Sequence, residues 1–352
     1  MKVGERDYRS IWQDNSDPST IRVIDQRRLP FSFDLMALRS VDDVCMAISS
    51  MAIRGAPLIG AAAAWGIYLS FLEHRTDKDI SAAVIKDAAR LKATRPTAVN
   101  LAWAVDHMME VFKNQPFAEV LCREATSLCN TEAERSRRIG VHGLALIEEI
   151  SRRKDGSPVN ILTHCNAGWL ACVDYGTALA PVYLAHDNGI KVHVWVDETR
   201  PRNQGSRLTV WELSNHGVPC TLITDNAGGH LMQNGMVDLV LVGCDRATVN
   251  GDVANKIGTY LKALAAHDNG IPFYSVFPVS TFDMSIEHPG QITIEERDAD
   301  EVRMIGDIYI TPRNIPVSNY GFDVTPARLI TGILTDRGIC KADKESILNL
   351  LS

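Results

Sequence analysis

Residues 159–168 read VNILTHCNAG, an apolar β-rich run that ends in the polar group His164-Cys165-Asn166. Similar short runs recur at residues 191–196, 220–224, 237–242 and 272–276, and helical stretches separate them. Such alternation predicts parallel βαβ units and therefore an open α/β sheet.

Polar residues follow each of these runs. In chain order they are His164-Cys165-Asn166, Asp197-Glu198-Thr199-Arg200, Asp225-Asn226, Cys244-Asp245-Arg246 and Pro278-Val279-Ser280. Open α/β sheets bind ligands at the carboxyl ends of their strands. The sheet domain is therefore predicted to be the catalytic domain.

The first 150 residues have a different pattern. Apolar residues recur at helical spacing in five stretches: 41–52, 58–72, 80–91, 101–112 and 117–148. A polar turn at residues 153–158 then precedes the first β-rich run. We predict a smaller, mainly helical N-terminal domain over residues 1–150 and an α/β domain over residues 151–352.

Composition excludes several classes of protein. Of 352 residues, 45% are hydrophobic and 22% are charged, which is typical of a soluble globular chain and not of a disordered one. The formal net charge of −7 argues against binding nucleic acid through a basic surface. The longest apolar stretch, residues 58–72, is shorter than the roughly 20 residues of a membrane span, so we expect a buried helix and no membrane association.

The N-terminus and the cysteines indicate the compartment. The first 12 residues contain no apolar core of the signal-peptide type. The eight cysteines are scattered and include no Cys-x-x-Cys pair, which favours reduced thiols in the cytoplasm.

Cys165 is the candidate nucleophile or base. It lies between a strand and an expected helix, where the helix dipole would lower the thiol pKa and favour the thiolate. The alternative is a buried turn cysteine without chemistry. Cys172, expected inside the same helix, is predicted to belong to the core.

Asp245 is the candidate general acid. It follows the apolar run at residues 237–242, and partial desolvation there would raise the pKa of its carboxyl group. The alternatives are a helix N-cap or a structural ion pair with Arg246.

Two arginines precede proline-marked helix starts, in Arg54-Gly55-Ala56-Pro57 and Arg95-Pro96-Thr97-Ala98. Exposed backbone N–H groups beside an arginine suit a phosphate. The alternative in each case is a surface arginine beside a tight turn.

Residues 250–258 are expected to form a polar loop before a helix that ends near His267. Lys256 in this loop could neutralise a phosphate, and Gln204-Gly205 could hydrogen-bond a sugar hydroxyl, although taken singly a capped loop is the favoured interpretation of each. The sequence has no Walker loop, G-x-G-x-x-G, H-E-x-x-H, zinc-type Cys/His cluster or G-x-S-x-G. No metal site is therefore predicted.

Several motifs together resemble those of the methylthioribose-1-phosphate isomerase family of methionine salvage. They are Ile24-Asp25-Gln26 with Leu29-Pro30, Arg54-Gly55-Ala56-Pro57, Arg95 to Asn100, Thr163 to Gly168, Asp197 to Pro201, Gly243 to Arg246, Asn250 to Thr259, and Phe322 to Ala327. They occur in order and extend over nearly the whole chain, which makes them far more specific together than singly.

The resemblance implies a Rossmann-like catalytic domain, a homodimer, a sugar-phosphate substrate and neither metal nor organic cofactor. It implies that Cys165 and Asp245 are the catalytic pair. The positions that match the family's substrate-binding residues are Arg54, Gly55, Ala56, Arg95, Gln204, Asn255 and Lys256.

The same superfamily includes isomerases of 5-deoxyribose 1-phosphate and ribose 1,5-bisphosphate, and non-catalytic regulatory subunits of a translation-initiation exchange factor. Because both catalytic positions are intact, an enzyme is favoured over a sugar-phosphate-sensing scaffold. The chain departs from the family pattern at Arg202-Asn203, at Cys244 and, in Asn319-Tyr320-Gly321 where Asn-Pro-Ala is usual, at Tyr320 and Gly321. These departures leave open which 5-substituent of the ribose 1-phosphate is preferred.

Overall fold

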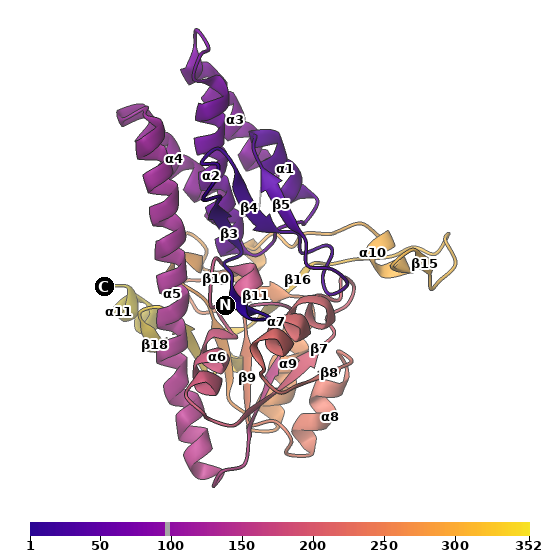
Figure 1. Ribbon diagram of the computed structural model, residues 1–352. Helices are drawn as coiled ribbons and strands as arrows, with labels where there is room; N and C mark the ends of the chain where they lie inside the picture. The colour runs from indigo at the N-terminus through magenta and orange to yellow at the C-terminus, as the bar shows by residue number, and fades with distance from the viewer. Residues whose placement is uncertain (96–98) are drawn as a thin grey trace. The chain divides into compact units, whose positions relative to one another are not determined.

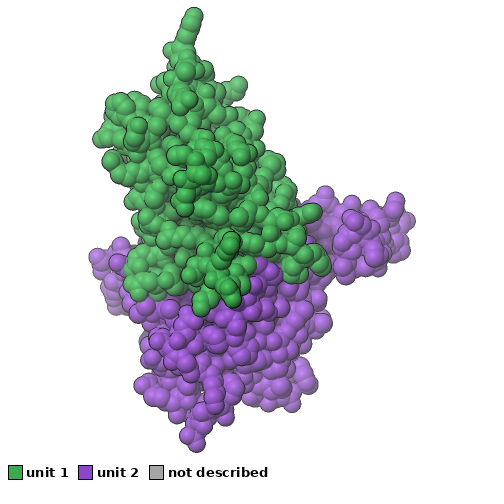
Figure 2. Space-filling model, in the orientation of Figure 1, with its two compact units in different colours: residues 1–137, 168–176 green, residues 138–167, 177–352 purple. Residues whose placement is uncertain are grey.

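The computed structural model describes residues 1–95 and 99–352, which divide into two compact units (Figure 2). Unit 1 comprises residues 1–137 and 168–176, and unit 2 comprises residues 138–167 and 177–352. The predicted boundary at residue 150 lies within the long helix α5, Ala118–Arg153 (Figure 1). The assignment of domains to residues 1–150 and 151–352 stays a prediction.

Unit 1 is mainly helical. Its helices are α1 (Val41–Ser49), α2 (Ala56–His74), α3 (Ile80–Ala93), α4 (Val99–Asn114) and the first part of α5. Together with α5 they confirm the five predicted helical stretches. A capping box between Ser40 and Asp43 satisfies the N-terminus of α1, and the side chain of Asp79 caps α3.

The small strands of unit 1 are absent from the sequence-based prediction. They form a three-stranded antiparallel sheet of β3 (Ile11–Gln13), β4 (Ile21–Ile24) and β5 (Leu35–Leu38), and a two-stranded pair of β1 (Lys2–Val3) and β2 (Arg6–Asp7). These strands have only two to four residues each. Runs that short are too brief for a period-2 pattern to be recognised.

Helix α2 is the buried helix that its composition predicted. By length and composition alone it could cross a membrane, but 72% of its most apolar window is buried inside the protein. Residues 58–70 of this helix are all buried. An all-round apolar surface is what a core helix requires.

Unit 2 is built on a seven-stranded sheet in the order β18-β17-β12-β9-β6-β7-β8. The five predicted strands are confirmed and are parallel to their neighbours: β6 (Val159–Thr163), β7 (Val192–Asp197), β8 (Cys220–Ile223), β9 (Leu239–Val242) and β12 (Phe273–Val276). One further parallel strand, β17 (Gly332–Thr335), and an antiparallel edge strand, β18 (Gly338–Cys340), complete the sheet.

The strand order reverses between β6 and β9. Helices α6 (Ala180–Asp187) and α7 (Val210–His216) lead outward from β6 to β8, whereas α8 (Ala227–Gln233) and α9 (Thr259–Asp268) lead back through β9 to β12 (Figure 1). Right-handed crossovers place these two pairs of helices on opposite faces of the sheet. The result is the predicted Rossmann-like α/β fold, with a topological switch point at the carboxyl ends of β6 and β9.

A four-stranded sheet continues from β9. Its order is β13-β10-β11-β16, with bounds Phe282–Asp283, Arg246–Thr248, Val253–Lys256 and Phe322–Thr325. The predicted loop at residues 250–258 is therefore wrong, because β10 and β11 form an antiparallel hairpin there. The helix expected after it is α9.

Residues 298–318 form a segment that we call the arm. It contains α10 (Asp300–Arg303), β14 (Met304–Ile305) and β15 (Ile308–Tyr309), and it extends away from the large sheet of unit 2 (Figure 1). The C-terminal helix α11 (Lys344–Leu351) ends the chain.

Candidate active site

Cys165 directly follows β6 in a tightly bonded turn. Its backbone has a φ of +67° and the residue is only 8% exposed. Its N–H donates to Oγ1 of Thr199 at 2.8 Å, and its carbonyl accepts from Oγ1 of Thr209 at 2.7 Å. The thiol lies 3.4 Å from Oε1 of Gln204 and donates to it. Protein groups thus fix both the backbone and the sulfur of Cys165.

The helix predicted after Cys165 is wrong. Residues 166–179, all of them described, contain only a single 3₁₀ turn, Trp169–Ala171, before α6 begins at Ala180. The left-handed φ of Cys165 turns the chain away from a helical path. No helix dipole therefore acts on the Cys165 thiol from this segment. Cys172 follows the 3₁₀ turn and is buried, as predicted.

Gln204 is held in place by an unusual backbone. It precedes a π-helical turn, Gly205–Thr209, of the kind often found at functional sites. A Cβ atom on Gly205 would lie 1.7 Å from the carbonyl oxygen of Asp197, so only glycine allows this approach. Thr199 and Asn203, with φ values of +63° and +55°, flank the turn that leads to Gln204. The close packing of Gly205 against Asp197 places the neighbouring Gln204 at the end of β7, where its side chain reaches Cys165.

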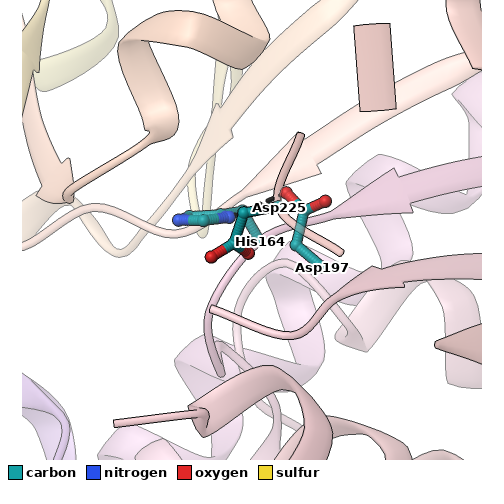
Figure 3. A group of neighbouring side chains, drawn as sticks. All are labelled: His164, Asp197 and Asp225. Carbon is teal, nitrogen blue, oxygen red and sulfur yellow. Dashed lines mark hydrogen bonds and ion pairs between the residues drawn. The ribbon is translucent and has the colours of Figure 1, made fainter. Parts of the chain in front are cut away.

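A buried polar network begins at His164, the residue before Cys165, and includes Asp197, which Figure 3 shows together with His164 and Asp225. Nδ1 of His164 lies 2.8 Å from Oδ2 of Asp197, while Nε2 of His164 donates to the carbonyl of Ile257 at 2.8 Å. Nζ of Lys262 lies 3.2 Å from the same oxygen of Asp197, and it also donates to the carbonyl of Asp225. This network ties the ends of β6, β7 and β8 to the turn before α9.

His164, Asp197 and Asp225 could in principle hold a metal ion, because their ligand atoms lie within 4.8 Å of one another (Figure 3). Their bonding points to a structural role instead. The Lys262 ammonium already supplies positive charge at Asp197. The Asp225 carboxylate accepts the backbone N–H groups of Thr199 and Arg200 at 2.7 and 2.8 Å.

Asp245 lies at the neighbouring strand end, after β9. Its N–H donates to the carbonyl of Ala254 at 2.9 Å, which begins the β10–β11 hairpin. Asp245 is exposed in this chain, and the raised pKa predicted for its carboxyl group stays a prediction. The burial falls on Cys244 instead, where it raises the thiol pKa well above the ordinary value, with the charge of Asp245 adding to the effect. Nη1 of Arg246 forms an ion pair with Oδ2 of Asp283, at 3.5 Å.

Gly243 shows that these elements adjoin at one edge of the sheet. A Cβ atom there would lie 2.9 Å from Cβ of Ala167 and 3.9 Å from Oδ1 of Asn255. Ala167 is two residues from Cys165, and Gly243 is two residues from Asp245. The switch point therefore brings the Cys165 turn, the Asp245 strand end and Asn255 together.

Asn255 and Lys256 form the end of β11. Nδ2 of Asn255, a buried residue, donates to Oγ1 of Thr259 at 3.0 Å. Nζ of Lys256 donates to the carbonyl of Gly321 at 3.1 Å and lies 4.7 Å from the centre of the Phe322 ring. Both side chains are thus positioned from β11 and the neighbouring β16.

The N-terminus of α9 already holds an anion of the protein itself. Asp323 accepts from the N–H groups of Gly258 and Tyr260 at 2.7 and 3.1 Å. Burial raises the pKa of Asp323, and these two hydrogen bonds partly offset the rise. A phosphate near Lys256 would therefore meet the ammonium group and not the amides of this helix end.

Arg54, Gly55 and Ala56 belong to unit 1. The predicted proline-marked helix start is confirmed, since α2 begins at Ala56 with Gly55 as N-cap. Gly55 has a φ of +98°, and a Cβ atom on it would lie 2.2 Å from the carbonyl oxygen of Ala171, which is also in unit 1. Arg54 is buried.

Arg95 also belongs to unit 1, where Nη1 lies 3.9 Å from Sδ of Met51. Residues 96–98, the rest of the predicted Arg-Pro-Thr-Ala motif, lie outside the described residues. Helix α4 begins directly after them, at Val99.

Sequence reasoning missed several residues that build this site. Thr209, Lys262 and Glu301 carried no recognisable motif, whereas Thr199 lay inside a quoted strand end. Arg202, a departure from the family pattern, and Asn319, which directly precedes the departures Tyr320 and Gly321, both donate to the carboxylate of Glu301, at 2.6 and 3.2 Å.

Comparison with known proteins gives full-length matches. The methylthioribose-1-phosphate isomerases of Desulfatibacillum aliphaticivorans and Gluconobacter oxydans are each 52% identical to this chain, over 99% of it and 98% of their own length. The crystal structure of 5-methylthioribose 1-phosphate isomerase from Pyrococcus horikoshii OT3 has a TM-score of 0.88 and 38% identity over 98% of this chain and 96% of that one.

A second similar solved structure is named as a translation initiation factor and not as an isomerase. The translation initiation factor eIF-2B subunit delta from A. fulgidus gives a TM-score of 0.85 and 38% identity over 98% of this chain and 99% of that one. The family model described as "Initiation factor 2 subunit family" matches residues 52–342. The chain therefore belongs to the methylthioribose-1-phosphate isomerase family, within the broader initiation factor 2 subunit family.

Proposed function

We propose that this chain is an aldose–ketose isomerase that converts 5-methylthioribose 1-phosphate into 5-methylthioribulose 1-phosphate in methionine salvage. The observation that carries the proposal is 52% identity along essentially the whole chain to proteins named for this activity. The adjoining positions of the Cys165 turn and the Asp245 strand end support it.

The first step opens the sugar ring. A phosphate on C1 prevents the ordinary opening to a free aldehyde, so the bond between C1 and the ring oxygen must break directly. The electron pair of that bond goes to the ring oxygen, which takes a proton from the Asp245 carboxyl group. Because Asp245 is exposed in this chain, we propose that bound substrate desolvates it.

The second step moves a hydrogen from C2 to C1, and two routes are open. In one, the Cys165 thiolate removes the C2 proton to leave an enol phosphate and then returns a proton to C1. In the other, the C2 hydrogen moves to C1 as a hydride. In both routes the C2 hydroxyl proton returns to Asp245 as the ketone forms, so the protein ends the cycle unchanged.

Substrate contacts are assigned to the residues that match the family's substrate-binding positions. In unit 2, Lys256 is proposed to pair with the phosphate, and Gln204 and Asn255 are proposed to hydrogen-bond the sugar hydroxyls. In unit 1, the resemblance assigns substrate contacts to Arg54, Gly55, Ala56 and Arg95. The reaction as written uses no metal or organic cofactor.

Proton NMR of the purified protein with methylthioribose 1-phosphate tests the proposal. We expect rapid formation of the ketose, and much slower conversion of 5-deoxyribose 1-phosphate and ribose 1-phosphate in parallel. Faster conversion of the deoxy sugar would keep the chemistry and change the substrate. Failure to convert any of the three, in a protein shown to be folded, would overturn the isomerase assignment.

The same assay in heavy water separates the two routes. Enolisation predicts solvent deuterium at C1 of the product, because the Cys165 thiol exchanges its hydrogen with solvent. Complete retention of the C2 hydrogen would favour the hydride route.

A second candidate is a non-catalytic subunit that senses sugar phosphates. It is favoured by the match to the A. fulgidus protein named as an initiation factor subunit. Binding of methylthioribose 1-phosphate in calorimetry without any turnover would support it.

We further propose a cytoplasmic homodimer, as the family resemblance implies. Sedimentation equilibrium should give twice the chain mass of 38.8 kDa. A monomer that retains full activity would contradict the dimer.

A further inference from the structure

The side chain of Glu301, at the base of the arm, is a largely buried hub of charged hydrogen bonds. Its carboxylate accepts from Nη1 of Arg202 at 2.6 Å, from Nη2 and Nε of Arg297 at 2.8 and 3.0 Å, and from Nδ2 of Asn319 at 3.2 Å. Burial alone would raise the pKa of Glu301, but the two guanidinium groups outweigh it and lower the pKa to about 2. The hub is therefore charged across the working pH range.

One side of the hub reaches the turn that carries Gln204. Arg202 lies two residues before Gln204, and Arg200 donates to the arm carbonyls of Val302 and Met304 at 2.8 and 3.3 Å. The two arginines therefore fasten the turn to the arm from one side. The Asp225 carboxylate holds the same turn from the other side through the backbone N–H of Arg200.

The turn before Gln204 has a strained backbone, which requires contacts from its surroundings to persist. Asn203, between Arg202 and Gln204, has a φ of +55°, and its side-chain Oδ1 is buried without a hydrogen-bond partner among the described residues. Non-glycine residues in left-handed conformations persist only where their surroundings hold them. The turn ends at Gln204, whose Oε1 accepts from the Cys165 thiol.

The other side of the hub reaches Lys256. The root of the arm is a pair of backbone bonds, from Arg297 N–H to the carbonyl of Asn319 and from Gly321 N–H to the carbonyl of Glu295, each at 2.8 Å. The carbonyl of Gly321 in turn accepts from Nζ of Lys256. One carboxylate thus lies between the element that positions Gln204 and the element that positions Lys256.

We infer that Glu301 is a positioning residue for the isomerase reaction, acting through Arg202 to hold Gln204 against the Cys165 thiol. The inference rests on the proposed function of the same site. The arm contains none of the predicted catalytic or substrate-binding residues. Through Glu301 it fixes the positions of Gln204 and Cys165.

The test combines turnover with a direct reading of Cys165. In Glu301→Gln the shape is kept and the charge is lost, and we expect kcat/KM to fall about 10- to 100-fold, as misplaced site groups do. Labelling of Cys165 by iodoacetamide, followed by peptide mass spectrometry with Cys340 as internal reference, should accelerate at least about threefold as the Gln204 contact loosens.

A matched control separates this role from general disturbance of the arm. Asp300→Asn removes a neighbouring negative charge from the same helix. The Asp300 side chain is 48% exposed and forms an ion pair with Arg303. We expect wild-type turnover and wild-type Cys165 labelling from it. The effects of Glu301→Gln and Arg202→Met on kcat/KM should be non-additive in the double variant, because both substitutions remove the same contact.

Three results would overturn the inference. They are wild-type turnover with wild-type Cys165 labelling in a folded Glu301→Gln protein, equal effects from Asp300→Asn, or additive effects of the Glu301 and Arg202 variants. If the wild-type protein converts none of the sugar phosphates, the proposed function fails. The labelling of Cys165 still tests the arm in that case.

Discussion

The turn that carries Cys165 and the strand end that carries Asp245 adjoin, yet they are built in opposite ways. Cys165 is buried, and side chains of three residues bond its N–H, its carbonyl and its thiol. Asp245 is exposed, and its backbone N–H begins a hairpin. The protein therefore fixes the proposed base before substrate arrives, whereas the proposed acid depends on substrate to exclude water.

This contrast reflects what each group needs. A thiol that must reach one carbon atom gains from a fixed position, because misplacement by about 1 Å can cost a factor of about 100 in rate. A carboxyl group that must donate a proton gains from a pKa that rises when water leaves. The contrast predicts different responses to substitution on the two sides.

The largest effects are expected from the two proposed catalytic residues themselves. Cys165→Ser and Asp245→Asn should each lower turnover at least about 100-fold, within the range for general acid–base groups. The thermal unfolding midpoint of both variants should lie within a few degrees of the wild-type value. Cys244→Ser is the control for a neighbouring, partly buried thiol and should keep near-normal turnover. A near-normal rate for Asp245→Asn would show that an exposed carboxyl group is not the acid.

Glycine substitutions compare the backbones of the two regions. In Gly205→Ala the new Cβ atom would lie 1.7 Å from a backbone oxygen that cannot yield, so we expect destabilisation by more than about 3 kcal/mol. In Gly243→Ala the new atom meets Cβ of Ala167 at 2.9 Å, and overpacking of this kind costs about 1–3 kcal/mol. Urea unfolding measures both. Equal losses would show that the Cys165 side is no more tightly built than the Asp245 side.

Threonine hydroxyls provide a finer comparison. Thr199 accepts from the N–H of Cys165, and Thr248 accepts from the N–H of Asp252 in the hairpin after Asp245, at 2.8 and 3.1 Å. Replacing either by valine leaves a backbone N–H without its partner, at about 1–3 kcal/mol. Stability should fall similarly in both variants.

Activity distinguishes the two threonines, because only Thr199 holds the turn of the thiol. We expect Thr199→Val to lower kcat about 10-fold or more, while Thr248→Val stays near wild type. The measurement is the steady-state rate well below the unfolding temperature of each variant. Equal rates for the two would remove Thr199 from the positioning of Cys165.

The sequence predicted those parts of the fold that repeat a pattern over many residues. Five helical stretches and five strands were recognised because apolar periodicity records burial directly. The strands β3, β4 and β5 and the β10–β11 hairpin were missed although β8, β9 and β12 are equally short. The predicted strands alternate with helical stretches, and the missed ones lie outside that alternation.

The candidate site divides in the same way. Cys165 and Asp245 could be selected because strand ends in open α/β sheets collect functional groups. The groups that hold them could not, because Thr209, Lys262 and Glu301 come from elements that meet only in the folded chain. The helix predicted after Cys165 failed for a related reason: a left-handed φ at a cysteine has no sequence signature.

The smallest expected effect concerns two carboxylates that hold the outer parts of the site, and whose pKa values are shifted in opposite directions. Glu301 has a folded-state pKa of about 2, below its ordinary value of 4.5. Its contribution to stability is therefore complete above pH 4.5 and is lost as the pH falls toward 2. Burial raises the pKa of Asp323 above 3.8, so its contribution is complete below pH 3.8 and is lost as the pH rises through the raised value.

The free energy of unfolding, measured in urea from pH 3.5 to 6 for wild type, Glu301→Gln and Asp323→Asn, tests this opposition. Removing the Glu301 charge should abolish about 1 kcal/mol of the stability that wild type gains between pH 3.5 and 5. Asp323→Asn should have the opposite effect and steepen the gain with pH, because the loss due to Asp323 is removed. Parallel pH curves for all three proteins would mean that neither carboxylate is coupled to folding as its surroundings require. Parallel curves for wild type and Glu301→Gln alone would argue against the arm as the anchor of the Gln204 turn. The contrast between a buried, bonded thiol and an exposed acid would then rest on Thr199 and Thr209.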